Sequence, residues 1–426
     1  MNRFFLLCIV LILTGCTATA PVVETPATVV PASATAEQTA TPEPTAISAQ
    51  TPTPEPSPTP EPATPTATAL PPTLVPASDA PDRFEQGRRL GRGVNLGNAL
   101  EAPSEGDWGL VLQAEYFALI KEAGFDTIRV PIRWSAHALS EPPYTVDEAF
   151  FERVDWVIEN GLAQALNVVI NMHHYEEIFT EPTAHTARFV AIWEQIATRY
   201  KDLPVTVYFE PLNEPHDMLS DAKWNEVLLE TVLAIRRIDN RHTLVVSGGK
   251  WGGIKGLPLL KIPEGEQNYV CSFHYYDPML FTHQGAEWSS AEYGTLGVIW
   301  PGPPPVELTP SPDAAKVGWV NTWFFQYNQL PSETNPAGPK PILTDLDYAL
   351  RWGEQLDCAL WMGEFGAYSK ADMDSRVNWT TFMRTEAESR GIAWAYWEFG
   401  SGFGVYNRDE NRWNEGLLKA LIPDEP

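Results

Sequence analysis

Short apolar runs alternate with longer segments of helical periodicity throughout residues 82–426, and this alternation most strongly limits the possible folds. Strands that alternate with helices pair in parallel, and eight such repeats indicate closure into a barrel. We therefore expect an α/β fold, a (β/α)8 TIM barrel that forms a single domain over residues 81–426. A doubly wound open sheet is the alternative, but no glycine-rich phosphate loop follows the first strand.

The expected elements cover most of this domain. Strands are predicted at 92–98, 126–132, 166–172, 205–211, 243–247, 269–274, 359–364 and 392–397. Helices are predicted at 113–123, 147–161, 183–200, 221–239, 257–261, 345–356, 372–390 and 413–421.

Residues 277–342 form an insertion that lacks any period, with proline clusters at 301–305 and 336–341. A loop this long inside a compact domain usually has a function. We expect a lid or groove wall above the sixth strand, and the alternative is an insertion packed on the side of the barrel. The aromatic residues of the segment fit both interpretations: Trp319, Trp323, Phe324 and Phe325.

The first 80 residues have the composition of a targeting segment and a linker. An apolar run at 4–13 follows Arg3 and is too short to span a bilayer. Residues 13–16, Leu-Thr-Gly-Cys, resemble the bacterial lipobox, so we expect residues 1–16 to be a lipoprotein signal segment that ends at a lipidated Cys16. An ordinary secretory signal with an incidental cysteine is the alternative. Residues 17–80 are rich in Thr, Pro, Ala and Glu, which predicts a disordered linker.

The net charge of the chain argues against several classes of partner. With 55 acidic and 29 basic residues, the chain has a formal charge of −26, which argues against nucleic acid and anionic lipid and suits a neutral polymer.

Only Cys271 and Cys358 lie in the predicted domain. A pair is possible in an exported protein, but we expect two buried free thiols, because two cysteines make no disulfide framework.

Polar and aromatic side chains follow the predicted strands at all eight ends. In a (β/α)8 barrel these ends share one face, where active sites are built. We therefore expect this set to gather there: Asn98, Glu101, Arg129, Arg133, His173, His174, Asn213, Glu214, Lys250, Trp251, His274, Tyr276, Glu364, Trp397 and Glu398.

Two carboxylates at different strand ends are what hydrolysis of a glycosidic bond requires. Glu214 lies between Pro211 and Pro215, which end the fourth strand, and Glu364 lies at the end of the seventh. In a retaining mechanism one carboxyl is the general acid/base and the other is the nucleophile, about 5–5.5 Å apart. We assign Glu214 as acid/base and Glu364 as nucleophile.

The neighbours of these two residues receive supporting roles. Arg129 and a hydrogen bond from Tyr276 are expected to keep Glu364 ionised. Asn213 is suited to a sugar 2-hydroxyl. We expect His173 and His274 to position the carboxylates and the ring hydroxyls.

Other interpretations of single residues remain open. His173 and His174 could form a fragment of a metal site with Asp277, although no further ligand spacing supports this and we expect no metal. Arg129 alone would be a structural ion pair, and Trp397 alone would be core. The chain has 16 tryptophans, and indoles in the strand-end loops suit stacking on sugar rings: Trp251, Trp288 and Trp397.

The motifs of residues 84–422 resemble glycoside hydrolase family 5, the cellulase family. They are RGVNLGN at 92–98, RVP at 129–131, NMHH at 171–174, LNEP at 212–215, HYY at 274–276, GEFG at 363–366 and WAYW at 394–397. NALEAP at 98–103, residues 281–288 and WEF at 397–399 look closest to the family's thermophilic bacterial endoglucanases that also cleave mannan. The proline-rich insertion after Trp288 is longer than we expect for that group.

The resemblance implies a retaining β-1,4-glycan endohydrolase without a cofactor. It implies sugar contacts on the non-reducing side for four residues, Asn98, Glu101, His174 and Glu398. Trp251 and Trp288 would line the cleft.

We therefore expect an exported endo-β-1,4-glucanase, a cellulase, with mannan or glucomannan as a second substrate. It would be a monomer that binds polysaccharide and no nucleic acid, and that meets the membrane only through its N-terminal lipid. A dedicated β-mannanase or a xyloglucan hydrolase is the alternative enzyme. A surface lipoprotein that binds glycan without cleaving it is the alternative from another class.

Overall fold

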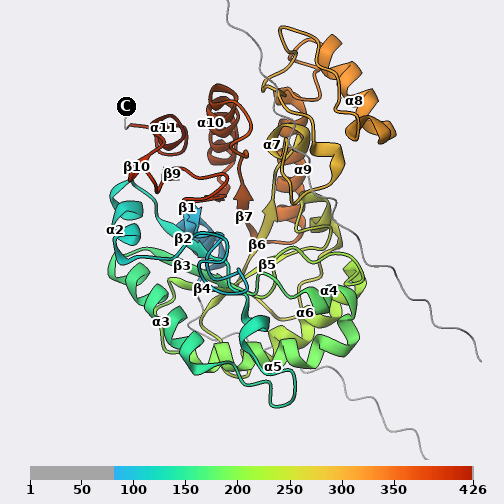
Figure 1. Cartoon of the computed structure of the whole chain (residues 1–426). Helices are drawn as coiled ribbons and strands as arrows, with labels where there is room; N and C mark the ends of the chain where they lie inside the picture. Colours follow the sequence, from blue (N-terminus) through green and yellow to red (C-terminus); the bar gives the residue numbers. More distant parts are fainter. Residues whose placement is uncertain (1–80, 425–426) are drawn as a thin grey trace, which may run out of the picture. The chain divides into compact units, whose positions relative to one another are not determined.

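The computed structural model describes residues 81–424, and these contain a closed barrel of eight parallel strands (Figure 1). Strand β1 pairs with β2 on one side and with β8 on the other, which closes the barrel. The predicted signal segment, Cys16 and the linker at 17–80 lie outside the described residues. The strands are β1 (Arg92–Asn95), β2 (Thr127–Val130), β3 (Asn167–Asn171), β4 (Val207–Glu210), β5 (Thr243–Ser247), β6 (Tyr269–His274), β7 (Ala359–Phe365) and β8 (Ala393–Tyr396).

The helices that connect the strands surround this barrel, so the predicted (β/α)8 fold is confirmed. Side chains cap several of them at the N-terminus; the Asp147 carboxylate, for example, accepts from the backbone N–H of Ala149. The segment predicted as a short helix near 257–261 is a 3-10 helix that contains Pro258. The connecting helices are α2 (Ala114–Glu122), α3 (Glu148–Ala163), α4 (Glu176–Thr180), α5 (Pro182–Tyr200), α6 (Asp221–Arg236), η2 (Ile254–Leu259), α9 (Pro339–Gln355), α10 (Met373–Ser389) and α11 (Glu415–Leu421).

Helix α1 (Arg83–Leu90) was not predicted, and it covers the amino-terminal end of the barrel. Leu90 joins the inward-facing side chains of the barrel interior, and the Tyr208 hydroxyl donates to the Gln86 side chain at 2.7 Å. The helix escaped prediction because its eight residues are mostly polar or charged. Tertiary packing, not periodicity, places it.

The insertion between β6 and α9 is ordered rather than structureless. It contains α7 (Met279–Thr282), two 3-10 turns, η3 (Ala291–Tyr293) and η4 (Ala314–Lys316), and a helix of 12 residues, α8 (Gly318–Gln329). The buried Gln284 side chain fixes its first part by bonding the backbone of Phe281, Gly297 and Val298. A two-stranded hairpin, β9 (Tyr406–Asn407) and β10 (Arg412–Trp413), follows β8.

Cys271 and Cys358 form a disulfide, so the expectation of two free thiols was wrong. Cys271 lies in β6 and Cys358 directly precedes β7, and the pairing of these strands brings the two Cα atoms to 5.9 Å. The two cysteines are 87 positions apart in sequence. The disulfide could not be predicted because the sequence does not show how β6 and β7 align.

None of the helices within residues 81–424 is both long enough and apolar enough to cross a membrane.

The disulfide should contribute measurably to stability. In the double variant Cys271→Ala/Cys358→Ala, we expect the free energy of unfolding to fall by about 2–4 kcal/mol, because the crosslink closes a long loop in the unfolded chain. Guanidinium chloride denaturation with and without dithiothreitol measures the effect. Reductant should lower the midpoint of the wild type and leave that of the double variant unchanged; a wild-type midpoint indifferent to reductant would contradict the crosslink.

Candidate active site

Arg129 is the centre of the site, and its fully buried guanidinium bonds four side chains at once. Its Nε and Nη2 donate to the two carboxylate oxygens of Glu210 at 2.7 and 2.8 Å, a bidentate pair. Nη1 also donates to Asn95 at 2.9 Å, and Nη2 donates to Asn213 at 2.7 Å. Burial alone would lower the pKa of Arg129, but the carboxylates of Glu210 and Glu364 raise it, so the guanidinium stays charged.

Glu364, the predicted nucleophile, is held on both oxygens by charged or polar donors. Its Oε1 accepts from Arg129 Nη1 at 2.6 Å, and its Oε2 accepts from the Tyr276 hydroxyl at 2.8 Å. Burial, and next the Glu364 carboxylate, raise the pKa of Tyr276 well above its ordinary value, so this hydroxyl remains a donor. Both contacts that the sequence led us to expect for Glu364, with Arg129 and with Tyr276, are present in the structure.

A bulge in β7 aims Glu364 across the barrel mouth. Phe273 pairs with Met362, but His274 pairs with Glu364, so Gly363 is the extra residue. A side chain at position 363 would meet the Ser272 hydroxyl at 2.8 Å. Glycine therefore permits the bulge that sets the carboxylate opposite His274.

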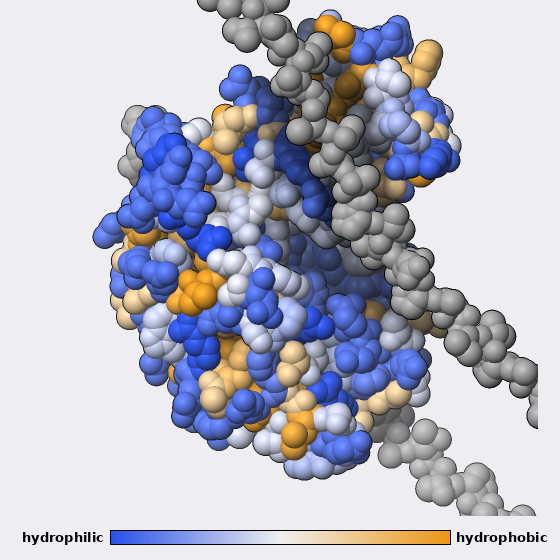
Figure 2. Space-filling model, in the orientation of Figure 1, coloured by the Kyte–Doolittle hydropathy of each residue, from blue (hydrophilic) through white to orange (hydrophobic). Residues whose placement is uncertain are grey.

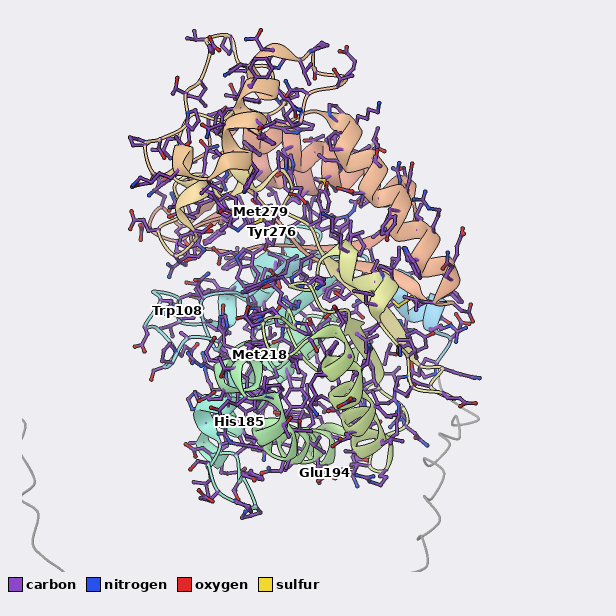
Figure 3. The ribbon with its side chains drawn as sticks, turned by 90° about the vertical axis from the view of Figure 1, so that its right-hand side faces the viewer. Trp108, His185, Glu194, Met218, Tyr276 and Met279 are labelled. Atoms are coloured by element: carbon purple, nitrogen blue, oxygen red, sulfur yellow. A yellow bond between two sulfur atoms is a disulfide. The ribbon has the colours of Figure 1, made fainter. Side chains whose placement is uncertain are left out.

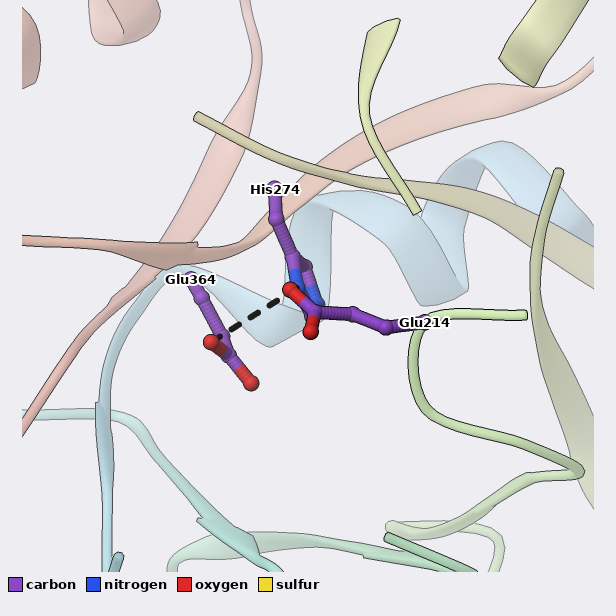
Figure 4. A group of neighbouring side chains, drawn as sticks. All are labelled: Glu214, His274 and Glu364. Carbon is purple, nitrogen blue, oxygen red and sulfur yellow. Dashed lines mark hydrogen bonds and ion pairs between the residues drawn. The ribbon is translucent and has the colours of Figure 1, made fainter. Parts of the chain in front are cut away.

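Glu214, the predicted acid/base, faces Glu364 across His274 (Figure 4). His274 Nδ1 lies 2.8 Å from Glu214 Oε1 and 3.6 Å from Glu364 Oε2. The side chain of Glu214 is 24% exposed against 6% for Glu364, so Glu214 is the carboxyl that solvent and a leaving group can reach. Burial would lower the pKa of His274, but the carboxylates of Glu364 and Glu214 raise it above its ordinary value, so the ring can donate to Glu214.

The separation of the two carboxyl groups distinguishes between the two mechanisms of glycoside hydrolysis, retaining and inverting. An oxygen of Glu214 lies within 4.8 Å of an oxygen of Glu364. Retaining enzymes hold these groups about 5–5.5 Å apart, whereas inverting enzymes leave about 6.5–9.5 Å for a water molecule. The arrangement therefore suits direct attack by Glu364 on a sugar.

His173 and Trp397 form one wall beside this pair. Their rings stack at 5.6 Å with an interplanar angle of 10°, and His173 Nδ1 lies 3.1 Å from the Asn171 amide nitrogen. Burial, the neighbouring imidazole of His174 and the guanidinium of Arg129 hold the pKa of His173 well below its usual range. The ring is therefore neutral and can orient hydroxyl groups without adding charge.

Glu101 and Glu398 are buried carboxyls that shape the loops after β1 and β8. Glu101 accepts from the backbone N–H groups of Asn98 and Ala99, and Glu398 accepts from that of Phe403 at 3.2 Å. Burial raises the pKa of Glu101 to about 7 and that of Glu398 to about 8. Glu101 therefore supports the loop after β1 that carries Asn98, and Glu398 supports the loop after β8. Direct sugar contact by either residue stays a prediction.

Exposed aromatic rings border the face that carries these residues. Trp251 is 54% exposed and stacks on His216 at 3.5 Å, while Trp288 is 63% exposed and meets the Tyr368 ring edge-on at 4.7 Å. Trp108, which the sequence did not single out, lies edge-on to His174 at 5.7 Å. Figure 3 shows Trp108 and Met218 on the barrel side, and Tyr276 and Met279 beneath the insertion.

Two residues of the polar network were also missed from sequence, Glu210 and Asn95. Glu210 lies in the predicted strand at 205–211 but received no role, although a charged residue within an apolar strand needs a buried partner. Asn95 bonds the carbonyl of Gly363 as well as Arg129, and only the closure of the barrel brings it there.

Glu214, His274 and Glu364 also form the group of potential metal ligands found among residues 81–424. Their oxygens and nitrogen are already paired: Arg129 and Tyr276 donate to Glu364, and His274 is bonded to Glu214. A guanidinium in contact with one of the three ligands disfavours a second cation there. His173, His174 and Asp277 do not make such a group in that part of the chain.

A barrel with two facing carboxyls at this separation, one of them held by an arginine and a tyrosine, defines the class of retaining glycoside hydrolases. The family model of cellulase (glycosyl hydrolase family 5) matches residues 92–402. The chain belongs to glycoside hydrolase family 5.

Named relatives are similar over most of the chain. Endoglucanase H of Acetivibrio thermocellus is 32% identical over 361 residues, which cover 83% of this chain but only 35% of that protein. Crystal structures of Thermotoga maritima Cel5A with mannotriose and with cellobiose are 45% and 46% identical, each with a TM-score of 0.70, covering 80% of this chain and 100% of Cel5A.

The buried carboxyls should make stability fall as the pH rises. Above pH 4.5, the ordinary value, the unfolded chain loses protons that folded Glu101 and Glu398 keep until about pH 7 and 8. Their stabilising contribution is therefore complete below that ordinary value and declines by about 1.4 kcal/mol per pH unit for each group, up to about pH 7 for Glu101 and about pH 8 for Glu398. Denaturation between pH 5 and 8 should show a shallower decline for Glu398→Gln than for the wild type.

The exposed Glu148, on α3, provides the matched control for this comparison, because its side chain is 68% exposed. Glu148→Gln should keep the wild-type slope. A Glu398→Gln slope equal to that of the wild type would show that Glu398 ionises in the ordinary range.

Proposed function

We propose that this protein is a retaining endo-β-1,4-glucanase that also accepts mannan or glucomannan and works as a monomer without a cofactor. The pair of Glu214 and Glu364 within 4.8 Å carries this proposal, together with the donors that hold Glu364. Support comes from the similarity to Endoglucanase H and from Cel5A, which was solved with cellobiose and with mannotriose.

The reaction follows in two steps. In the first, a Glu364 oxygen attacks the anomeric carbon, the bond from that carbon to the leaving oxygen breaks, and the proton of Glu214 passes to that oxygen. In the second, Glu214 takes a proton from water, the water oxygen attacks the same carbon, and the ester bond to Glu364 breaks.

The other residues assist these steps without changing covalently. Asn213, fixed by Arg129, is placed to bond the sugar 2-hydroxyl, whose hydrogen bond strengthens in the transition state. His274 lies between both carboxyls and can hold Glu214 in position as its proton leaves and returns. The exposed rings of Trp251 and Trp288 suit stacking on sugars further along the chain of the polymer.

Reducing-sugar release from carboxymethylcellulose, barley β-glucan, glucomannan and xyloglucan tests the proposal. The wild type should act on the glucans and on glucomannan, and Glu214→Gln should lower the rate by about 10²–10⁴-fold because general acid catalysis is lost. Glu364→Ala should abolish turnover while the protein still folds and binds glycan.

The outcomes separate the alternatives. Activity confined to glucomannan would make the protein a mannanase, and activity confined to xyloglucan would make it a xyloglucan hydrolase. Near-normal turnover by Glu364→Ala would remove Glu364 as nucleophile. Binding without release from any polymer would favour the non-catalytic lipoprotein.

We also propose that the protein is exported and anchored outside the cell by a lipid on Cys16. The observation behind this is the apolar run at 4–13 followed by Leu-Thr-Gly-Cys. Cys16→Ala should move the protein from the membrane fraction into the medium, as measured by fractionation and immunoblotting. A variant that remains in the membrane fraction would exclude the lipid anchor.

A further inference from the structure

Helix α8 of the insertion exposes aromatic side chains and contains no charged residue. Its 12 residues, GWVNTWFFQYNQ, include no Asp, Glu, Lys or Arg, in a protein with 55 acidic and 29 basic residues. Trp319 is 48% and Phe325 is 69% exposed, whereas Val320, Phe324 and Tyr327 are buried on the other face. Exposed faces of surface helices are usually covered by charged residues, so this composition needs an explanation.

The exposed face has a regular arrangement of ring and polar side chains. At 3.6 residues per turn and 1.5 Å rise per residue, Trp319 and Phe325 lie about 9 Å apart along the axis and about 120° apart around it. Thr322, Gln326 and Gln329 are exposed and lie between the two rings around the helix. Two rings thus flank a strip of hydroxyl and amide groups.

The lobe that carries α8 is held firmly, so its rings are presented in a fixed place. The Tyr327 hydroxyl bonds both the N–H and the carbonyl of Ile299, and the Asn328 amide does the same with Leu308. Trp323 stacks on Tyr327 at 4.9 Å. Pre-organised groups lose little entropy when they bind a ligand.

The insertion is also attached to the barrel. The backbone N–H of Trp300 donates to the Ser375 hydroxyl at 3.0 Å, and its ring packs on Phe382 of α10. The lobe therefore has a defined relation to the strands that carry the site.

The lobe continues the face on which the site opens. The insertion begins directly after β6, the strand that ends at His274, and it includes the exposed Trp288 near the site. In Figure 1, α8 projects beyond α7 on the same part of the molecule. Figure 2 shows a hydrophilic hollow between this lobe and the remainder of the barrel face.

We propose that the exposed face of α8 is a second glycan-binding surface, separate from the catalytic residues, that takes a neutral β-1,4-linked chain of the polymer being cleaved. Trp319 and Phe325 stack on pyranose rings, and the amides and hydroxyl between them bond sugar hydroxyls. The absence of charged residues from the helix fits a neutral occupant, and the position beside the site fits the same polymer. The inference rests on the proposed function.

Binding is measured on the full chain with Glu214→Gln, so that the polymer stays intact. Affinity electrophoresis in gels with barley β-glucan or glucomannan should show binding weakened by about five- to tenfold in Trp319→Ala/Phe325→Ala. Val306→Ala is the matched control, because Val306 is an exposed apolar residue of the same insertion, 77% exposed and not aromatic. It should bind like the parent, and single Phe325→Ala should lose part of the affinity.

Activity measurements on proteins that retain Glu214 show whether the two rings act in the catalytic cleft or outside it. The double variant should show a higher KM on polymer and an unchanged kcat/KM on cellotetraose, which occupies only the catalytic cleft. Unchanged polymer binding would overturn the proposal, and so would an equal loss on cellotetraose, which would place α8 in the catalytic cleft itself. A shift from dimer to monomer on removal of the rings would overturn it by making α8 an interface between two copies.

The experiments distinguish failure of the proposed enzymatic function from failure of the proposed glycan-binding surface on α8. If the wild type cleaves no polymer but is retained by it and loses retention with the rings, the surface on α8 stands and the proposed function fails. If the wild type cleaves polymer and the rings make no difference to binding, only the second surface fails.

Discussion

The buried guanidinium of Arg129 is the interaction on which both the barrel and its site depend. It extends from β2 and contacts side chains of three other strands. These are Asn95 of β1, Glu210 of β4 together with Asn213 directly after it, and Glu364 of β7. Burying one cation is affordable only when its partners are all in place, and the loss of one leaves an uncompensated charge in the interior. The same guanidinium thus links β2 to β1, β4 and β7 and holds the carboxylate of Glu364, the predicted nucleophile.

The sequence predicted the barrel and most of the site because both follow from local patterns. Apolar runs marked the strands, and polar residues marked their carboxyl ends, so Glu214, Glu364 and Tyr276 could be placed without coordinates. Features that depend on strand register or on packing across the barrel could not be predicted from the sequence. Helix α1 lacks an apolar period, and the pairing of Cys271 with Cys358 depends on how β6 and β7 align. The role of Glu210 appears only when Arg129 turns inward beside it.

The insertion shows how a barrel can gain surface without changing its chemistry. Its internal hydrogen bonds, such as those of Gln284 and Tyr327, satisfy buried polar groups within the segment itself. The catalytic pair does not depend on α8, since its contacts come from the strands and from Tyr276. Under the two proposals made above, capture of polymer and cleavage of a bond would be separate properties, and sequence changes in 277–342 could alter the first without altering the active site.

The disulfide joins β6 and β7, the same two strands whose carboxyl ends carry His274 and Glu364. Cys271 and Cys358 join β6 and β7 near the start of β7, while His274 and Glu364 face each other at the far end. A covalent bond at one end limits how far the two strands can slide or separate at the other. Under reducing conditions that constraint is removed, and the alignment of His274 with Glu364 then depends on the strand pairing alone.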